Sequence, residues 1–203
     1  ILAVRMPYRT SSSDSLLDAQ AVISQTGVQS LTVEITPMVD PLIERFPDMN
    51  RTRRGNIMAR QRMIVLFDQS AAFSGLVVGT GNKTESLLGY TTLYGDSACA
   101  FNPIGDLYKT QVRQLSRELS LPQSILSKAP SADLWDGQTD EGELGFTYHE
   151  VDQLLYLLVD QKLPPADCKA FGFSEAFILK VIDRMERNQF KRVLPPIAKL
   201  ASL

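Results

Sequence analysis

The feature that most constrains the fold is an apolar run that passes directly into a glycine-containing polar turn. Residues 76–78 (Leu-Val-Val) are typical of a buried strand, and the Gly-Thr-Gly turn at 79–81 lets the backbone approach a ligand closely. Thr84 is a helix-capping residue type, and Glu85 follows it in the first helical turn. A strand, a turn and a helix in this order place Thr80 and Glu85 at the carboxyl end of a strand, where open α/β sheets bind ligands.

Two interpretations of Glu85 are open on this segment alone. A carboxylate at a strand end can hold a magnesium ion that substrate phosphates also hold. Equally, Glu85 can do no more than complement the positive end of the helix that Thr84 caps.

The order of the other elements predicts an α/β protein with a parallel sheet and helices on both faces. Three apolar, β-rich runs, at residues 1–6, 31–35 and 76–79, alternate with helical stretches. These stretches are expected at residues 13–27, 41–46 and 55–73. The last of them is apolar around much of its circumference, which suits either a central helix or a subunit interface.

The second half of the chain is expected to be more helical than sheet-like. Apolar spacing predicts helices at 107–119 and 151–159, and a last helix at 173–190 that Ser174 caps. The acidic, glycine-containing stretch 136–145 between them is expected to be a mobile surface loop.

Composition limits the function classes. The chain has 203 residues, 44% of them hydrophobic, and a net charge of −2, which predicts one domain without a basic nucleic-acid footprint. No apolar run approaches the roughly 20 residues of a membrane span, so we expect a cytoplasmic protein. Cys99 and Cys168 lack metal-site spacing and are expected to be reduced and structural. His149, the only histidine, is expected on an exposed helix position, and a single histidine excludes a Cys/His zinc site.

Seven separated segments resemble the nicotinamide adenine dinucleotide (NAD) synthetases, and they follow the order of that family. The Asp96 to Lys109 region is most similar to the short, ammonia-using bacterial members. The segments are residues 1–8, 55–63, 79–96, 102–110, 128–135, 138–145 and 190–192.

This resemblance implies an adenine nucleotide α-hydrolase-like, Rossmann-like fold and an ammonia-dependent ligase of NAD biosynthesis. The implied reaction adenylates the carboxylate of deamido-NAD with ATP, releases pyrophosphate, and lets ammonia displace AMP to give NAD. The resemblance also implies Mg2+ as cofactor and a homodimer built on helices around residues 55–73.

The implied site residues fall into three groups, with Asp96 and Lys109 closest to the chemistry. The ATP group is Arg5, Thr80, Lys109 and Ser131; the deamido-NAD group is Arg60, Asp96 and Lys191; the metal ligand is Glu85.

The residues by themselves leave other roles open. Arg5 can simply cover a strand end, and Arg60 and Arg62 can be solvated helix charges. Asp96 can be an ordinary turn residue after Gly95, and Ser131 can cap its own helix.

The chain departs from the family pattern in several places. The family has a Ser-Gly-Gly-x-Asp-Ser phosphate loop that does not occur in these residues, and the chain opens at Ile1 inside an expected strand, so we expect a single domain, residues 1–203, truncated at the amino end. Leu93, Ala100 and Phe190 stand where many members have substrate-contacting Lys, Asp and His. The alternatives are a catalytically inactive dimerising module or a related amidating enzyme such as a GMP synthetase.

Overall fold

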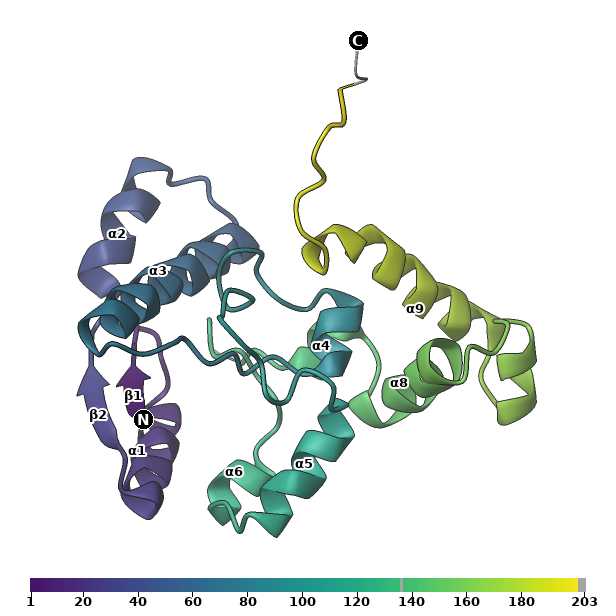
Figure 1. The fold of residues 1–203 in the computed structure, drawn as a ribbon, viewed down its shortest axis with the longest axis horizontal. Coiled ribbons are helices and arrows are strands. Elements are labelled where there is room, and N and C mark those ends of the chain that lie inside the picture. Colours follow the sequence, from purple (N-terminus) through teal and green to yellow (C-terminus); the bar gives the residue numbers. More distant parts are fainter. Residues whose placement is uncertain (136, 201–203) are drawn as a thin grey trace.

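The sheet at the start of the chain is a parallel pair of strands. The structure is a computed structural model that describes residues 1–135 and 137–200. Strands β1 (Leu2–Arg5) and β2 (Gln29–Thr32) pair in parallel, and helix α1 (Ser13–Thr26) connects them (Figure 1). A crossover helix between parallel strands is the βαβ unit. The predicted α/β class with a parallel sheet is confirmed.

Helices cover both faces of this sheet, as predicted. Alternate side chains of a strand point to opposite faces. The Arg5 guanidinium donates to the Gln20 side chain of α1 at 2.7 Å, whereas Val4 and Met6 pack on the other face. The helix there is α3 (Arg51–Ala72), whose Met58 and Val65 are buried in the same cluster.

Helix-end residues explain the bounds of the first helices. The Ser12 side chain accepts from the Ser15 amide at the start of α1, and Gly27 closes the helix in the left-handed region (φ +66°). Helix α2 (Thr36–Arg45) begins earlier than expected from residues 41–46. The long helix α3 also begins before residue 55, because Asn50 caps it at 2.9 Å.

Two of the three predicted strands need correction. The run 31–35 lies mostly beyond the strand, since β2 ends at Thr32 and Ile35 is buried against α2 and α3 instead. The run 76–79 forms no strand; Val78 makes a single parallel bridge with Phe101. Gly79 is needed there because a Cβ atom would lie 2.6 Å from the Cys99 sulfur, so its close approach is to this chain itself.

The C-terminal half is helical, as expected. Its helices are α4 (Lys83–Leu88), α5 (Lys109–Glu118), α6 (Gln123–Ser127), α7 (Asp140–Leu144), α8 (Tyr148–Leu155) and α9 (Glu175–Arg187). A π turn extends α8 over Tyr156–Asp160, and short 3-10 turns span Asp167–Phe171 and Gln189–Lys191. Ser174 caps α9 and His149 is exposed in the first turn of α8, as predicted. No helix in the described ranges has the length and apolarity needed to cross a bilayer.

The stretch expected to be a mobile surface loop is partly a buried helix, and that expectation is wrong for its described part. Helix α7 begins after the Thr139 cap, and its Asp140 and Leu144 are buried. The stretch folds because Leu144 joins a hydrophobic cluster with α8 and α9. Position 136, the start of the expected loop, lies outside the described residues.

Buried apolar side chains form two separate clusters. One joins α2 and α3 to the sheet through Tyr8, Ile35 and Met58, and we call it the sheet cluster. The other joins α4, α8 and α9 through Leu88, Leu154 and Val181, and we call it the helical cluster. Cys168 is a free thiol in the helical cluster, and Cys99 is also free.

Candidate functional site

A cavity of about 820 Å3 is lined by residues from the sheet with its helix α3 and by residues from the helical C-terminal half. The sheet side contributes Val4 of β1 and Met63 of α3, and the helical side contributes Tyr90 and Arg184. Six of the eight predicted site residues line it. They are Thr80, Glu85, Asp96, Lys109, Ser131 and Lys191.

Helix α4 positions Glu85 through a capping box. Asn82, not Thr84 as expected, is the cap: its side chain accepts from the Glu85 amide at 2.9 Å, and the Glu85 carboxylate accepts from the Asn82 amide at 3.0 Å. The other carboxylate oxygen of Glu85 accepts from the Lys109 ammonium at 2.7 Å. Glu85 therefore caps its helix and also faces the cavity, so both interpretations of this residue have structural support.

A buried polar hub fixes the backbone of Lys109. The Lys109 amide donates to the Thr84 hydroxyl at 2.9 Å, and that hydroxyl donates to Asp152 of α8 at 2.6 Å. The second Asp152 oxygen accepts from the Thr110 amide at 2.8 Å. Three helices, α4, α5 and α8, thus meet at one carboxylate, and the first residue of α5 is held where its side chain reaches the cavity.

Sequence reasoning missed Asp140, which is 4% exposed and lines the cavity. One of its oxygens accepts from the Tyr148 hydroxyl at 2.9 Å and lies 3.9 Å from the Lys109 ammonium. The other is buried without a hydrogen-bond partner among the described residues. Burial raises the pKa of this carboxyl group above its ordinary value. The signal available in the sequence was Thr139, a capping residue directly before an acidic helical turn.

Asp96 and Lys191 both act on the loop that follows α4. The Asp96 carboxylate accepts from the Thr91 hydroxyl at 2.6 Å and from the Thr92 amide at 2.8 Å. The Lys191 ammonium donates to the Gly89 and Thr91 carbonyls at 2.7 and 2.9 Å. Burial and the nearby positive charge of Arg184 lower the pKa of Lys191, and the negative charge of Asp96 opposes this shift.

The remaining predicted residues take different positions. Ser131 accepts from the Asp133 amide at 3.0 Å, and Thr80 is exposed at the cavity rim. Arg5 and Arg60 are not among the residues that line the cavity. Arg5 points to the α1 face, and Arg60 is exposed with its Nε donating to the Leu93 carbonyl at 3.2 Å.

Arg62, which the sequence left as a helix charge, does line the cavity. Its Nε donates to the Met6 carbonyl at 3.0 Å, and burial lowers its pKa. Two residues apart on one helix, Arg60 and Arg62 point in different directions, as their spacing predicts.

The arrangement suits a phosphate-bearing ligand. An ammonium between two carboxylates can release them and bind an anion instead, and the cavity size is in the range of small-ligand sites. Within residues 1–135 and 137–200, no three His, Cys, Asp or Glu side chains gather as a ready metal site. Fold and site together define the class: an α/β protein with a nucleotide-type cavity beside its parallel strands.

Comparisons with known proteins agree. The NAD synthase family model matches residues 1–195. The NH(3)-dependent NAD(+) synthetase of Trichlorobacter lovleyi is 58% identical over 199 residues, covering 98% of this chain and 73% of the relative. Among solved structures, the NH3-dependent NAD synthetase of Campylobacter jejuni superposes with a TM-score of 0.80 at 32% identity, covering 98% of this chain and 78% of that one. An NMN synthetase from Francisella tularensis superposes with a TM-score of 0.86, also at 32% identity, over 98% of this chain and 79% of that one.

The chain belongs to the NAD synthase family, and the resemblance read from its seven segments is confirmed.

Proposed function

We propose that this protein is an ammonia-dependent NAD synthetase, a ligase that converts deamido-NAD to NAD with ATP and ammonia. The nicotinate carboxylate attacks the α-phosphorus of ATP, pyrophosphate leaves, and ammonia then displaces AMP from the adenylate. The observation that carries the proposal is the Glu85–Lys109–Asp140 group on the wall of the cavity, in a chain that is 58% identical to a relative named for this activity.

Lys109 is the residue that we propose to act on the leaving group. Its ammonium leaves Glu85 for the phosphate oxygens of ATP, where it offsets the negative charge that develops as the bond to pyrophosphate breaks. The hub of Thr84 and Asp152 holds its backbone during this change, so only the side chain moves. Ser131 and Thr80, both on the cavity wall, are proposed to donate their hydroxyls to ATP.

The deamido-NAD side of the site is proposed to involve Asp96 and Lys191. Asp96 lies in the loop after α4, the Lys191 ammonium donates to carbonyls of that loop, and both residues line the cavity. We retain Arg60 as a proposed dinucleotide contact from the family pattern. Arg60 is exposed and its guanidinium donates a hydrogen bond to the Leu93 carbonyl, which supports a role at the protein surface, outside the main cavity.

Glu85 is the residue that we propose would hold Mg2+. Magnesium is commonly held by one or two protein carboxylates together with substrate phosphates, and Glu85 supplies a carboxylate on the cavity wall. When bound, the ion supplies charge stabilisation to the pyrophosphate. The Glu85 oxygen that now accepts from Lys109 is the one that would hold it.

We further propose a cytoplasmic homodimer whose interface includes α3. Ile64 and Phe67 of this helix are 53% and 42% exposed. Met38 and Leu42 of α2, the helix that packs against α3, are also exposed. A two-fold contact through these side chains would cover them.

The test is to incubate the purified protein with ATP, Mg2+ and ammonium, and to supply either deamido-NAD or nicotinate mononucleotide. Formation of NAD and AMP in the first mixture is the expected result. Amidation of the mononucleotide alone would assign the activity named for the Francisella relative instead. Failure to consume ATP with either substrate would contradict the proposal.

A further inference from the structure

A cluster of polar side chains outside the main cavity joins α4, α5 and the π turn that extends α8. The Lys83 ammonium donates to one Asp160 oxygen at 2.6 Å and lies 3.2 Å from the Asp106 carboxylate. The other Asp160 oxygen accepts from the Tyr108 hydroxyl, and the Lys83 ammonium lies 4.9 Å from the centre of the Tyr108 ring. We call these four residues the outer cluster, since none of them lines the main cavity.

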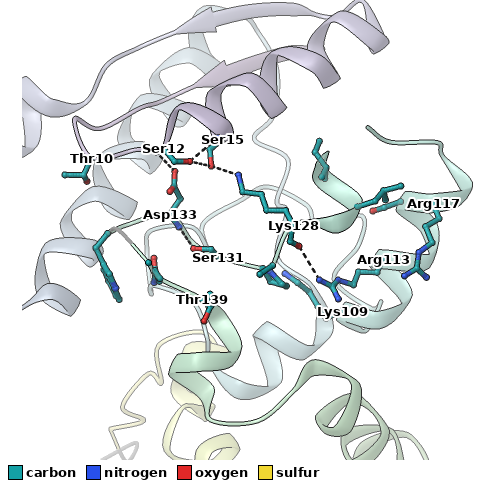
Figure 2. A pocket seen from close by; sticks show the side chains of 18 residues that line it. Thr10, Ser12, Ser15, Lys109, Arg113, Arg117, Lys128, Ser131, Asp133 and Thr139 are labelled. Atoms are coloured by element: carbon teal, nitrogen blue, oxygen red, sulfur yellow. Dashed lines mark hydrogen bonds between the residues drawn. The ribbon is translucent and has the colours of Figure 1, made fainter. Parts of the chain in front are cut away.

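The outer cluster holds the starts of the two helices that carry Glu85 and Lys109. Lys83 is the first residue of α4, and Tyr108 is the cap residue of α5, directly before Lys109. Lys109 lines the main cavity and also a neighbouring pocket of about 710 Å3, where Figure 2 labels it among the residues of the lining. A group that fixes Lys83 and Tyr108 therefore fixes the backbone from which both site side chains extend.

Helix α8 and its π turn supply two carboxylates, and each of them bridges α4 and α5. Asp152 accepts from the Thr84 hydroxyl of α4 at 2.6 Å and from the Thr110 amide of α5 at 2.8 Å. Asp160 forms the second bridge through the outer cluster, which bonds the first residue of α4 and the cap residue of α5. The buried hub and the outer cluster are thus two attachments of the same pair of helices.

The π turn explains how both carboxylates reach the same pair of helices. Asp160 follows Asp152 by eight positions, and in a regular α-helix this would turn it about 80° away from Asp152 around the helix axis. The wider π turn at Tyr156–Asp160 advances through fewer degrees per residue, so it brings Asp160 back toward the face of Asp152. Single π turns within α-helices are frequent at functional sites.

We propose that Asp160 is a positioning residue for the use of ATP: it keeps the starts of α4 and α5 in a fixed relation while the Lys109 ammonium exchanges Glu85 for phosphate oxygens. This rests on the proposed function. One attachment at Asp152 lets the two helix starts pivot about a single carboxylate, whereas a second attachment on the order of 10 Å further along α8 prevents that rotation. Displacement of a reacting group by about 1 Å can cost about 100-fold in rate, so even a small pivot matters.

The matched variants are D160N and D106N, because both remove one negative charge beside the same Lys83 ammonium. The Asp106 side chain is 96% exposed, and its one ion pair among the described residues is with Lys83. An asparagine at 160 has one acceptor oxygen where the carboxylate has two, so D160N loses one of the two bonds of the bridge. The third variant, Y108F, removes the hydroxyl that Asp160 accepts from and keeps the ring in the helical cluster.

Steady-state kinetics measure the positioning. D160N and Y108F are each expected to lower kcat/KM for ATP about tenfold and to leave the KM for deamido-NAD within about twofold of the wild type. D106N should match the wild type in both. The double variant of Tyr108 and Asp160 should lose no more than the weaker of the two single variants, since both break the same bond.

Two results overturn the proposal. One is a kcat/KM for ATP in D160N equal to that of D106N. The other is a rise in the KM for deamido-NAD as large as that in the KM for ATP, because the loss would then be a general one rather than one of positioning Lys109.

ATP binding separates failure of this proposal from failure of the proposed function. Trp135, the only tryptophan of the chain, lines the main cavity, so its fluorescence can be titrated with ATP without turnover. D160N should bind ATP about tenfold more weakly than D106N, and equal affinities overturn the proposal. A wild type that binds ATP and makes no NAD would contradict the proposed function, and this comparison of affinities would still decide the role of Asp160.

Discussion

Replacing Thr84 with valine should both destabilise the protein and impair its use of ATP. Thr84 is completely buried, and valine has nearly its shape, so the change removes a hydroxyl and little else. Two hydrogen bonds disappear: the one that Thr84 donates to Asp152 at 2.6 Å and the one that it accepts from the Lys109 amide at 2.9 Å.

The expected loss in the free energy of unfolding follows from the kinds of hydrogen bond that T84V removes. A hydrogen bond to a charged group contributes roughly 1.5–3 kcal/mol, and a neutral one roughly 0.5–1.5 kcal/mol. Asp152 keeps its bond from the Thr110 amide, so its charge is not left wholly without a partner. We therefore expect T84V to lose about 2–4 kcal/mol of the free energy of unfolding.

Urea unfolding followed by circular dichroism measures this loss, and kcat/KM for ATP reports the effect on Lys109. The matched control is T84S, which keeps the hydroxyl and loses only a methyl group, at a cost of about 1 kcal/mol. T84S should retain most of its ATP use, and T84V should not. If T84V unfolds at the same urea concentration as T84S, the hub does not hold the start of α5 and the reasoning fails.

Four other substitutions test the proposed site and the proposed dimer interface. E85Q should keep the fold and the capping bond to Asn82 but lose magnesium-dependent turnover; activity near the wild-type level at saturating magnesium would leave Glu85 as a helix cap only. F67D should turn a dimer into a monomer in sedimentation, whereas R60A should weaken deamido-NAD binding and leave the dimer intact; a wild type that sediments as a monomer at micromolar concentration would exclude the α3 interface. D140N should gain stability over the wild type as pH rises above the ordinary aspartate pKa of 3.8. The carboxyl group of Asp140 holds its proton more tightly in the folded protein than in the unfolded chain, so its ionisation destabilises only the wild type. Equal pH profiles of urea unfolding for the two proteins would contradict a buried Asp140 oxygen that has no hydrogen-bond partner among the described residues.

Helix ends were predictable from the sequence because their signals are local. Ser174 and Gly27 end their helices as the residue types require, since a cap needs only neighbours within the same turn. The cap of α4 was placed two residues late because Asn82 and Thr84 are both capping types. Only the partner of Thr84, an aspartate 68 positions away, decides between them.

The chemistry of the cavity was predictable only in part. Residues in the family-like segments, such as Lys109 and Asp96, do line it. The direction in which the Arg5 side chain points depends on strand alternation, and the pKa of Arg62 depends on its burial in the fold. The run 76–79 showed the limit of the apolar pattern, which reports burial and pairing together and cannot separate them. Asp140 was missed because its partners, Lys109 and Tyr148, come from other helices.

The separation of the sheet cluster from the helical cluster has a consequence for cooperativity. With the cavity filled by water, each cluster can open without the other, so amide hydrogen exchange should divide the chain into two units of different protection. A nucleotide that contacts both walls adds its binding free energy to the opening of either unit. Ligand binding should therefore slow exchange in α2 and in α9 together, and substrate would make one cooperative domain of two weakly joined halves.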